Sequence, residues 1–355
     1  MALLASLLRA FSRVILLAVG SVYSAIMLIE VSLLVFLKGR TVLTPREREE
    51  PACLRDPYLG GHDFVSIEDV TLHFVSSGNQ EKPLVLLLHG FPDFWYAWKH
   101  QILDLKKDFW VVALDLRGYG RSSKPKLVVN YRGQRIVEDV RQLIMSLGKM
   151  KANIVGHDWG AVIAWWLATK HGNLVEKLVI INGPHPLALK HQLEHSLSQM
   201  LMSWYFVAFQ LPWVPEACFC ANDLRLLDSL HTAYDEQERE AFKYAFCKPG
   251  AFTGPINYYR ASFRLECEDA LVYRQVGAPT LILWGCKDTA LTKDIAALSL
   301  RYASSGHVEY FPDAGHWLHR EKPKLVNDLI RSFLLSDKET RSCLSLLNHK
   351  GIANA

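Results

Sequence analysis

The chain has 355 residues, half of them hydrophobic, and a formal net charge of +4. This length can bury one large core together with an inserted cap, and so small and scattered a charge argues against nucleic acid as a partner. The seven cysteines form no Cys-x-x-Cys pair and no zinc-type spacing. We therefore expect free thiols in a reducing compartment, and neither a metal nor a cofactor.

Residues 14–37 are almost wholly apolar, with Glu30 as the main interruption. As a helix, this segment would extend roughly 36 Å, which exceeds the hydrocarbon core of a bilayer at about 30 Å. A cleaved signal peptide is the alternative, but its apolar part is normally about 7–15 residues long and precedes a small-residue cleavage site. No such site is evident, and we expect a transmembrane anchor within residues 1–40.

The charges on either side of the apolar segment favour one orientation. Arg9 and Arg13 precede the segment, whereas four cations follow it between residues 38 and 48. The positive-inside rule then places the rest of the chain in the cytosol, although the free amine and three nearby glutamates weaken the bias. The chain has no Asn-x-Ser/Thr sequon, which agrees with a cytosolic location. We expect a single-pass protein of the endoplasmic reticulum membrane.

After a linker over residues 41–61, the pattern is that of an α/β protein. Residues 64–75 alternate as an antiparallel edge hairpin does, and short apolar runs then recur as expected for buried strands. The segments between the runs are helical, as at 137–147, which predicts a mostly parallel sheet with helices on both faces. The predicted buried strands are 84–88, 110–114, 152–155, 177–181, 280–284 and 308–311.

This alternation stops near Pro184-His185-Pro186. Residues 184–276 are helical, aromatic and interrupted by prolines, which indicates a lid over the carboxyl ends of the strands, where such sheets bind ligands. The core would then consist of residues 62–183 and 277–336. The polar residues 337–355 would form a tail.

The pentad Gly156-His157-Asp158-Trp159-Gly160 follows a predicted strand and opens a predicted helix. It has the small-x-nucleophile-x-small form of a nucleophile elbow, with aspartate in place of serine. A carboxylate that attacks an ester gives only a labile mixed anhydride. Displacement at an activated saturated carbon instead gives an alkyl-enzyme ester that water can cleave. Epoxides and alkyl halides are therefore the expected substrates.

Two further polar residues complete the expected machinery. Asp288 follows the predicted strand at 280–284, and His316 follows the one at 308–311. The order of nucleophile, acid and histidine matches that of hydrolases with such an elbow. His316 would deprotonate water as the general base, and Asp288 would fix its tautomer and stabilise the imidazolium. Each residue alone has a structural explanation, as a turn, a helix cap or a buried histidine, but the joint pattern favours catalysis.

The loop after the first buried strand has the sequence His89-Gly90-Phe91-Pro92. We expect the backbone N–H groups of Phe91 and Trp159 to form an oxyanion hole around the ester oxygen that becomes negative when water attacks. His89, Pro92 and Trp95 are expected to line an apolar substrate pocket.

These motifs resemble those of the epoxide hydrolases of the α/β-hydrolase fold, most closely the membrane-anchored epoxide hydrolase 3 and 4 group. The resemblance covers about residues 51–335 and includes Asp-Leu-Arg-Gly-Tyr-Gly at 115–120 and Gly-Pro-Ile-Asn-Tyr-Tyr-Arg at 254–260. In that family two lid tyrosines bind the epoxide oxygen, and by motif position they look like Tyr205 and Tyr259. A phenol with a pKa of roughly 10 stays protonated at neutral pH and suits that task.

The resemblance implies hydrolysis of epoxides to vicinal diols, through the ester on Asp158 that the elbow predicts. An apolar pocket and attachment to a membrane favour apolar, lipid-derived epoxides as substrates. Two alternatives remain. Haloalkane dehalogenases share the aspartate elbow and the histidine, but they commonly have asparagine where Phe91 stands and lack the paired tyrosines. A non-enzymatic binding protein of the same fold would keep the pocket, but the intact triad argues against it.

Overall fold

The computed structural model describes residues 2–230, 234–265 and 275–336, with side chains from residue 13 onward. The predicted polar tail lies outside these residues. The described chain forms one eight-stranded sheet in the order β1-β2-β4-β3-β5-β6-β7-β8, in which β2 pairs antiparallel with β1 and β4 and the other pairs are parallel. The strands are β1 Gly61–Ile67, β2 Val70–Ser77, β3 Leu84–Leu88, β4 Trp110–Leu114, β5 Ala152–His157, β6 Val175–Ile181, β7 Thr280–Gly285 and β8 Gly306–Phe311.

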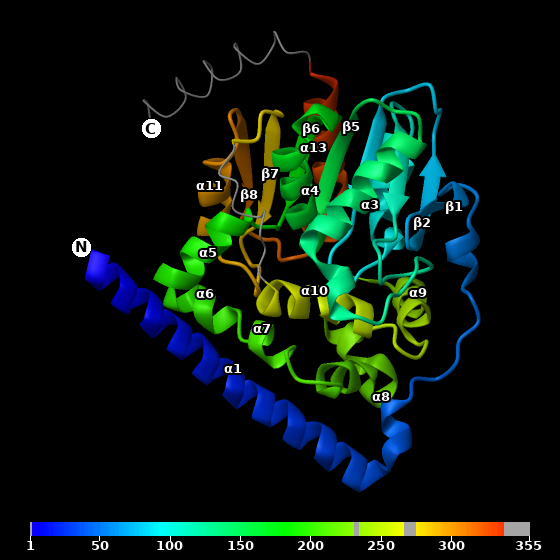
Figure 1. Ribbon diagram of the computed structural model, residues 1–355. Helices are drawn as coiled ribbons and strands as arrows, with labels where there is room; N and C mark the ends of the chain where they lie inside the picture. Colours follow the sequence, from blue (N-terminus) through cyan, green and yellow to red (C-terminus); the bar gives the residue numbers. More distant parts are fainter. Residues whose placement is uncertain (1, 231–233, 266–274, 337–355) are drawn as a thin grey trace.

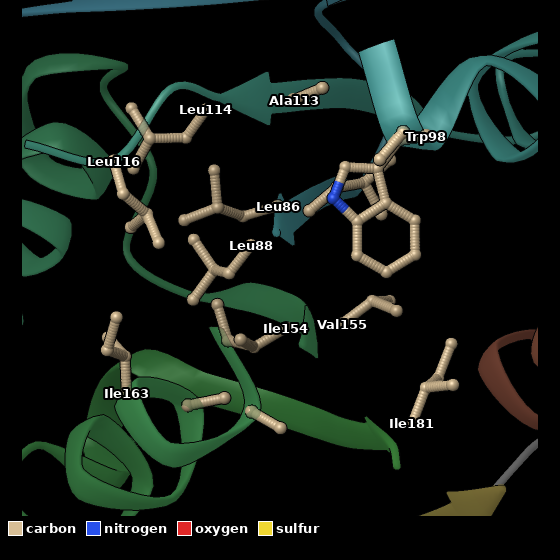
Figure 2. Packing of buried hydrophobic residues seen from close by; sticks show 14 of the residues in the cluster. Leu86, Leu88, Trp98, Ala113, Leu114, Leu116, Ile154, Val155, Ile163 and Ile181 are labelled. Carbon is tan, nitrogen blue, oxygen red and sulfur yellow. The ribbon is translucent and has the colours of Figure 1, made fainter. Parts of the chain in front are cut away.

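The predicted strands are therefore confirmed, each with ends within three residues of those expected. Strands β3 to β7 consist mainly of buried residues because helices cover both faces of the sheet. Figure 2 shows the centre of this core, where Leu86, Leu88, Ile154 and Val155 pack with no exposed surface. The core fixes the position of the strand ends that carry the site.

Helices pack on the two faces in separate groups. Helix α3 (Gly133–Ser146) lies beside α4 (Trp159–Lys170), as Figure 1 shows, and α2 (Lys99–Leu105) contacts α13 (Pro323–Leu335). The mostly parallel α/β architecture expected from the sequence is thus present. The bounds of the helices that follow or flank the strands are α2 Lys99–Leu105, α3 Gly133–Ser146, α4 Trp159–Lys170, α11 Asp294–Leu300, α12 Leu318–Glu321 and α13 Pro323–Leu335.

A helical insertion between β6 and β7 forms the lid. It lies below the carboxyl ends of the parallel strands in Figure 1, where the predicted catalytic residues are also found. Its helices are α5 Pro186–His195, α6 Leu197–Met202, α7 Tyr205–Ala208, α8 Val214–Leu230, α9 Glu236–Phe246 and α10 Thr253–Arg264.

The N-terminal helix α1 (Ala2–Lys38) packs along the lid and contacts α5, α6, α7 and α8 (Figure 1). It contains a 26-residue stretch, Arg13–Lys38, that is long and apolar enough to cross a membrane. The helix ends at Lys38, and the next residue, Gly39, has a φ of 77°, which suits glycine after a helix C-terminus.

The segment after α1 also lies on the lid. Arg48 reaches Asp223 at 2.7 Å and Glu240 at 3.0 Å, and Arg46 reaches Asp223 at 2.7 Å. The segment expected as a linker from the sequence is therefore attached to α8 and α9 by ion pairs. It continues through two short 3-10 helices, η1 Arg40–Leu43 and η2 Ala52–Arg55, to β1.

Candidate active site

Asp158 occupies a sharp turn between β5 and α4. Its backbone has φ 50° and ψ −119°, a strained combination for a residue other than glycine. The turn needs small neighbours, because a Cβ on Gly156 would lie 2.5 Å from the carbonyl oxygen of Gly160, and a Cβ on Gly160 would collide with the backbone of Leu88. These close approaches explain both glycines of the pentad, and they hold the Asp158 carboxylate at the cavity.

The loop after β3 contacts this carboxylate directly. The backbone N–H of Phe91 donates to Asp158 Oδ1 at 2.8 Å. Trp159 begins α4 immediately after the turn, and its side chain lines the cavity. The Phe91 N–H therefore already lies against an oxygen of the predicted nucleophile, as an oxyanion donor requires. That the Trp159 N–H is the second donor stays a prediction.

His316 lies between two carboxylates from different loops. Its Nδ1 is 2.7 Å from Asp288 Oδ2, and its Nε2 is 3.6 Å from Asp158 Oδ2. Asp288 is held in turn by the Asn182 side-chain amide at 2.7 Å and by the backbone N–H groups of Ala290 at 2.7 Å and of the next residue at 3.0 Å. The three residues predicted as a triad thus come together in space.

The charges in this group favour an ion pair. Burial alone would lower the pKa of His316, but the carboxylates of Asp288 and Asp158 outweigh burial and raise it well above its usual value. Burial would likewise raise the pKa of Asp288, yet the imidazole and the hydrogen bonds it accepts hold this pKa below normal. The two carboxylates therefore favour the protonated form of His316 while Asp158 is unmodified.

Two lid tyrosines share the cavity with Asp158. Tyr205 on α7 and Tyr259 on α10 have ring centroids 5.7 Å apart and an interplanar angle of 80°. Burial, followed by the negative charge of Asp158, raises the pKa of both phenols well above 10. Both hydroxyl groups are therefore protonated donors at neutral pH. The neighbouring Tyr258 is different, because its hydroxyl donates to the carbonyl oxygen of Arg117 at 2.9 Å.

The cavity beside these residues has a volume of about 530 Å³. Its exposed lining residues, which we call the mouth, are Arg13, Leu17, Lys190, Ser262 and Phe263. The inner wall is mainly apolar and comes from α1, α4, α5, α7 and α10. Its further lining residues include Leu16, Val162, Trp166, Leu189, Leu193, Phe206 and Leu291.

The expected pocket residues His89, Pro92 and Trp95 do not line this cavity, and that prediction is wrong for it. His89 is completely buried; its Nε2 accepts from the Leu116 N–H at 3.1 Å, and its Nδ1 lies 2.9 Å from the carbonyl oxygen of Gly90. These bonds occupy both ring nitrogens, so His89 shapes the loop that carries the Phe91 N–H.

Pro92 is buried too, and Trp95 lies over another part of the core. The backbone N–H of Trp95 donates to Asp115 Oδ1 at 2.9 Å, and its ring packs edge-on against His62 with centroids 5.3 Å apart. Aromatic composition near the motif suggested a pocket, whereas these side chains are directed into the core below the loop.

A buried polar cluster lies behind His316. Asp93, His157 and His319 have potential ligand atoms within 4.8 Å of one another, and none of the three is exposed. His157 Nε2 lies 2.9 Å from the backbone oxygen of His316, and Trp317 donates to Asp93 at 3.3 Å. Burial is the main reason why the pKa of His319 falls well below its usual value. These contacts indicate support for the His316 loop.

Sequence reasoning missed two groups of site residues. Asn182 follows β6 with a φ of 38°, and its amide holds Asp288 and the backbone oxygen of Gly285. A polar residue directly after a buried strand was a usable signal for it. The second group consists of the α1 residues that line the cavity, such as Leu16 and Leu17. Nothing in the sequence indicated this position, because an apolar N-terminal segment predicts a membrane anchor.

Comparisons with known proteins agree with this geometry. The family model of the alpha/beta hydrolase fold matches residues 83–323. Human epoxide hydrolase 4 is 40% identical over 317 residues, covering 85% of this chain and 86% of that protein. Mouse epoxide hydrolase 3 is 37% identical over 314 residues, covering 83% of each. An inhibitor complex of a Bacillus megaterium epoxide hydrolase superposes with a TM-score of 0.72 at 31% identity, covering 77% of this chain and 100% of that one.

The aspartate elbow, the triad geometry and the matched core define a hydrolase of the α/β-hydrolase fold. Within that fold, the chain belongs to the family of the epoxide hydrolases.

Proposed function

We propose that the protein converts epoxides to vicinal diols in two steps. The observation that carries this proposal is the placement of the Asp158 carboxylate beside two protonated phenols, Tyr205 and Tyr259, in one cavity. A carboxylate oxygen attacks a ring carbon while the carbon–oxygen bond of the epoxide breaks. The ring oxygen takes a proton from a tyrosine, which leaves a tyrosinate and a hydroxyalkyl ester of Asp158.

Water cleaves the ester in the second step. His316 takes a proton from water, and the resulting hydroxide attacks the carbonyl carbon of the Asp158 ester. The oxyanion that develops on the carbonyl oxygen is stabilised by the N–H groups of Phe91 and Trp159. The departing alkoxide takes the proton back from His316 to complete the diol. The carboxylic acid left at Asp158 then ionises, and its proton restores the tyrosine.

The two-carboxylate environment of His316 suits this order of steps. An imidazolium cannot act as a base, and His316 has a raised pKa while Asp158 is ionised. Ester formation neutralises Asp158 and removes one of the charges that raise this pKa. The pKa of His316 therefore falls after alkylation, and the imidazolium releases its proton to solvent. The neutral imidazole can then deprotonate water, and His316 takes up a proton from solvent again once Asp158 is freed from the ester.

The substrates we propose are apolar, lipid-derived epoxides. The apolar inner wall and a volume of about 530 Å³ suit a hydrocarbon chain better than a small polar molecule. Attachment to a membrane through α1 would give the enzyme access to substrates dissolved in lipid. The endoplasmic reticulum and the cytosolic side are proposed on the flanking charges and the resemblance alone.

A single turnover in isotopically labelled water tests the mechanism. The enzyme is used in excess over a lipid epoxide, and the label is traced in the diol and in the peptide that contains Asp158. We expect the label in Asp158 and an unlabelled diol, because water attacks the ester carbon. Label in the first diol would show direct attack by water. Release of halide from haloalkanes without diol formation from any epoxide would instead identify a dehalogenase.

A further inference from the structure

Helix α1 contacts the lid over nearly all of its apolar length. Leu16 lines the cavity beside α5, Gly20 lies against Val207 of α7, and Lys38 Nζ donates to Asn222 Oδ1 of α8 at 3.1 Å. At 1.5 Å per residue, the contact from Leu16 to Lys38 extends about 33 Å. The helix is therefore a docked part of the lid along this distance, as Figure 1 shows.

The docking is closest at α7. A Cβ on Gly20 would collide with Val207, so the two helices can come this close only because Gly20 has no side chain. Three residues further on, Tyr23 stacks on Trp204 with ring centroids 4.5 Å apart and an interplanar angle of 26°. Trp204 and Val207 flank Tyr205 in the sequence. Helix α1 thus braces the short helix that carries one of the two proposed epoxide donors.

The opposite face of α1 is apolar and exposed. The side chains there recur at intervals of three and four residues, which places them on one stripe of the helix. A helix that is apolar on both faces needs an apolar environment on each, and the lid supplies only one. The members of the outer stripe are Val22, Ile26, Ile29, Leu33 and Phe36.

The docked position conflicts with a helix that crosses the bilayer. The contact with the lid is about as long as the hydrocarbon core is thick, roughly 30 Å. A docked α1 that crossed the membrane would therefore draw the lid into the hydrocarbon, together with exposed charges such as Lys190, Arg225 and Arg264. Charged side chains at the bilayer centre are strongly unfavourable. Helix α1 can be docked or can cross the bilayer, but not both.

We propose that α1 lies in the plane of the membrane surface, with its outer stripe in lipid and its inner face on the lid. The partner is a lipid bilayer. The lid covers one apolar face of α1 and leaves the other for lipid, so the helix and the lid together can bind a bilayer as an amphipathic helix does. The mouth contains two exposed apolar residues, Leu17 of α1 at 47% and Phe263 of α10 at 48%, which suits a position close to the lipid surface. Arg13 and Lys190 in the mouth suit lipid phosphates. Lateral access of the substrate rests on the proposed epoxide hydrolysis, whereas the orientation of α1 does not.

Glycosylation mapping of the full chain tests the orientation without measuring activity. The chain has no natural Asn-x-Ser/Thr sequon, so one acceptor site on a flexible spacer can be added at the N-terminus or, in a separate protein, at the C-terminus. In microsomes, an in-plane helix leaves both ends on one side, and the two proteins have the same glycosylation state. Glycosylation of only one of them would show a helix that crosses the membrane and would overturn the proposal.

A matched pair of substitutions tests whether α1 is docked in the working enzyme. In vesicle-bound full chain, Gly20→Ile wedges α1 from α7, whereas Ala25→Ile adds the same side chain on an exposed position of the same helix. We expect Gly20→Ile to slow alkylation roughly 10–100-fold, as displacement of a catalytic group does. Hydrolysis of a preformed ester, and both steps in Ala25→Ile, should match wild type.

Equal alkylation rates in the two variants would show that the active enzyme does not use the docked helix. If the wild-type protein turns over no epoxide, the proposed function fails, and glycosylation mapping still decides the orientation.

Discussion

His316 Nε2 lies 3.6 Å from Asp158 Oδ2, beyond hydrogen-bond distance, whereas its Nδ1 is bonded to a second carboxylate at 2.7 Å. The hydrogen bond at Nδ1 thus fixes the imidazole, whereas Nε2 points toward the Asp158 carboxylate without a hydrogen bond to it. This asymmetry suits a base whose partner changes during the reaction, since Asp158 can become an ester without a bond to His316 being broken.

Asp158→Ala should abolish diol formation and leave the fold intact. The carboxylate lies at a cavity and not in the core, and alanine at a positive φ costs about 1–2 kcal/mol of unfolding free energy. Asp158→Asn, which tolerates this backbone conformation better, is the control for strain. Circular dichroism, thermal unfolding and diol production measure the effects, and turnover within tenfold of wild type would contradict the assignment.

His316→Gln should stop the reaction at the ester. Attack by Asp158 on the epoxide does not need the base, but water cannot then be deprotonated, so a covalent adduct accumulates. Mass spectrometry of the intact protein should detect one added substrate mass after exposure to a good epoxide substrate. An unmodified protein that also shows no burst of epoxide consumption would mean that the proposed order of steps is wrong.

Asp288→Asn should move the pH dependence of ester hydrolysis to lower pH. The Asp288 carboxylate raises the pKa of His316, so its removal lowers this pKa, and the neutral base is then present at lower pH. The maximal rate should also fall, because the imidazolium that forms in the transition state loses its partner. Single-turnover hydrolysis measured across pH tests both effects. A shift toward higher pH would contradict the electrostatic argument.

Tyr205→Phe and Tyr259→Phe should each slow alkylation by roughly 10²–10³-fold, the scale for loss of one oxyanion donor. The double variant should be nearly inactive, whereas hydrolysis of a preformed ester should hardly change. Tyr258→Phe is the matched control, because its hydroxyl bonds the backbone of Arg117 and not the cavity. Loss of this bond should cost stability of about 1 kcal/mol without slowing alkylation. Unchanged alkylation in both cavity variants would show that another group protonates the ring oxygen.

Local sequence patterns were sufficient for the sheet and for the meeting of the triad. Apolar runs give parallel strands, and residues that follow such strands meet at one edge of the sheet, which is why Asp158, Asp288 and His316 could be placed together. Their catalytic roles stay predictions until the variants are measured.

The walls of the cavity could not be predicted in the same way. Leu16 and Leu17 reach the cavity only because α1 docks on a lid that is distant in sequence, and hydropathy cannot distinguish docking from crossing a membrane. Trp95 was misplaced for a related reason: an aromatic side chain suits a core as well as a pocket, and only tertiary packing decides between them.

Residues of α1 form part of the cavity wall, so the docking of α1 on the lid and the binding of substrate in the cavity depend on each other. If the docked helix improves substrate binding by some factor, thermodynamic reciprocity requires bound substrate to strengthen helix docking by the same factor. The membrane would then act as an effector of the enzyme, and a tightly bound inhibitor would in turn make α1 harder to detach from the lid. Lipid composition could therefore set the affinity for the substrate as well as its local concentration.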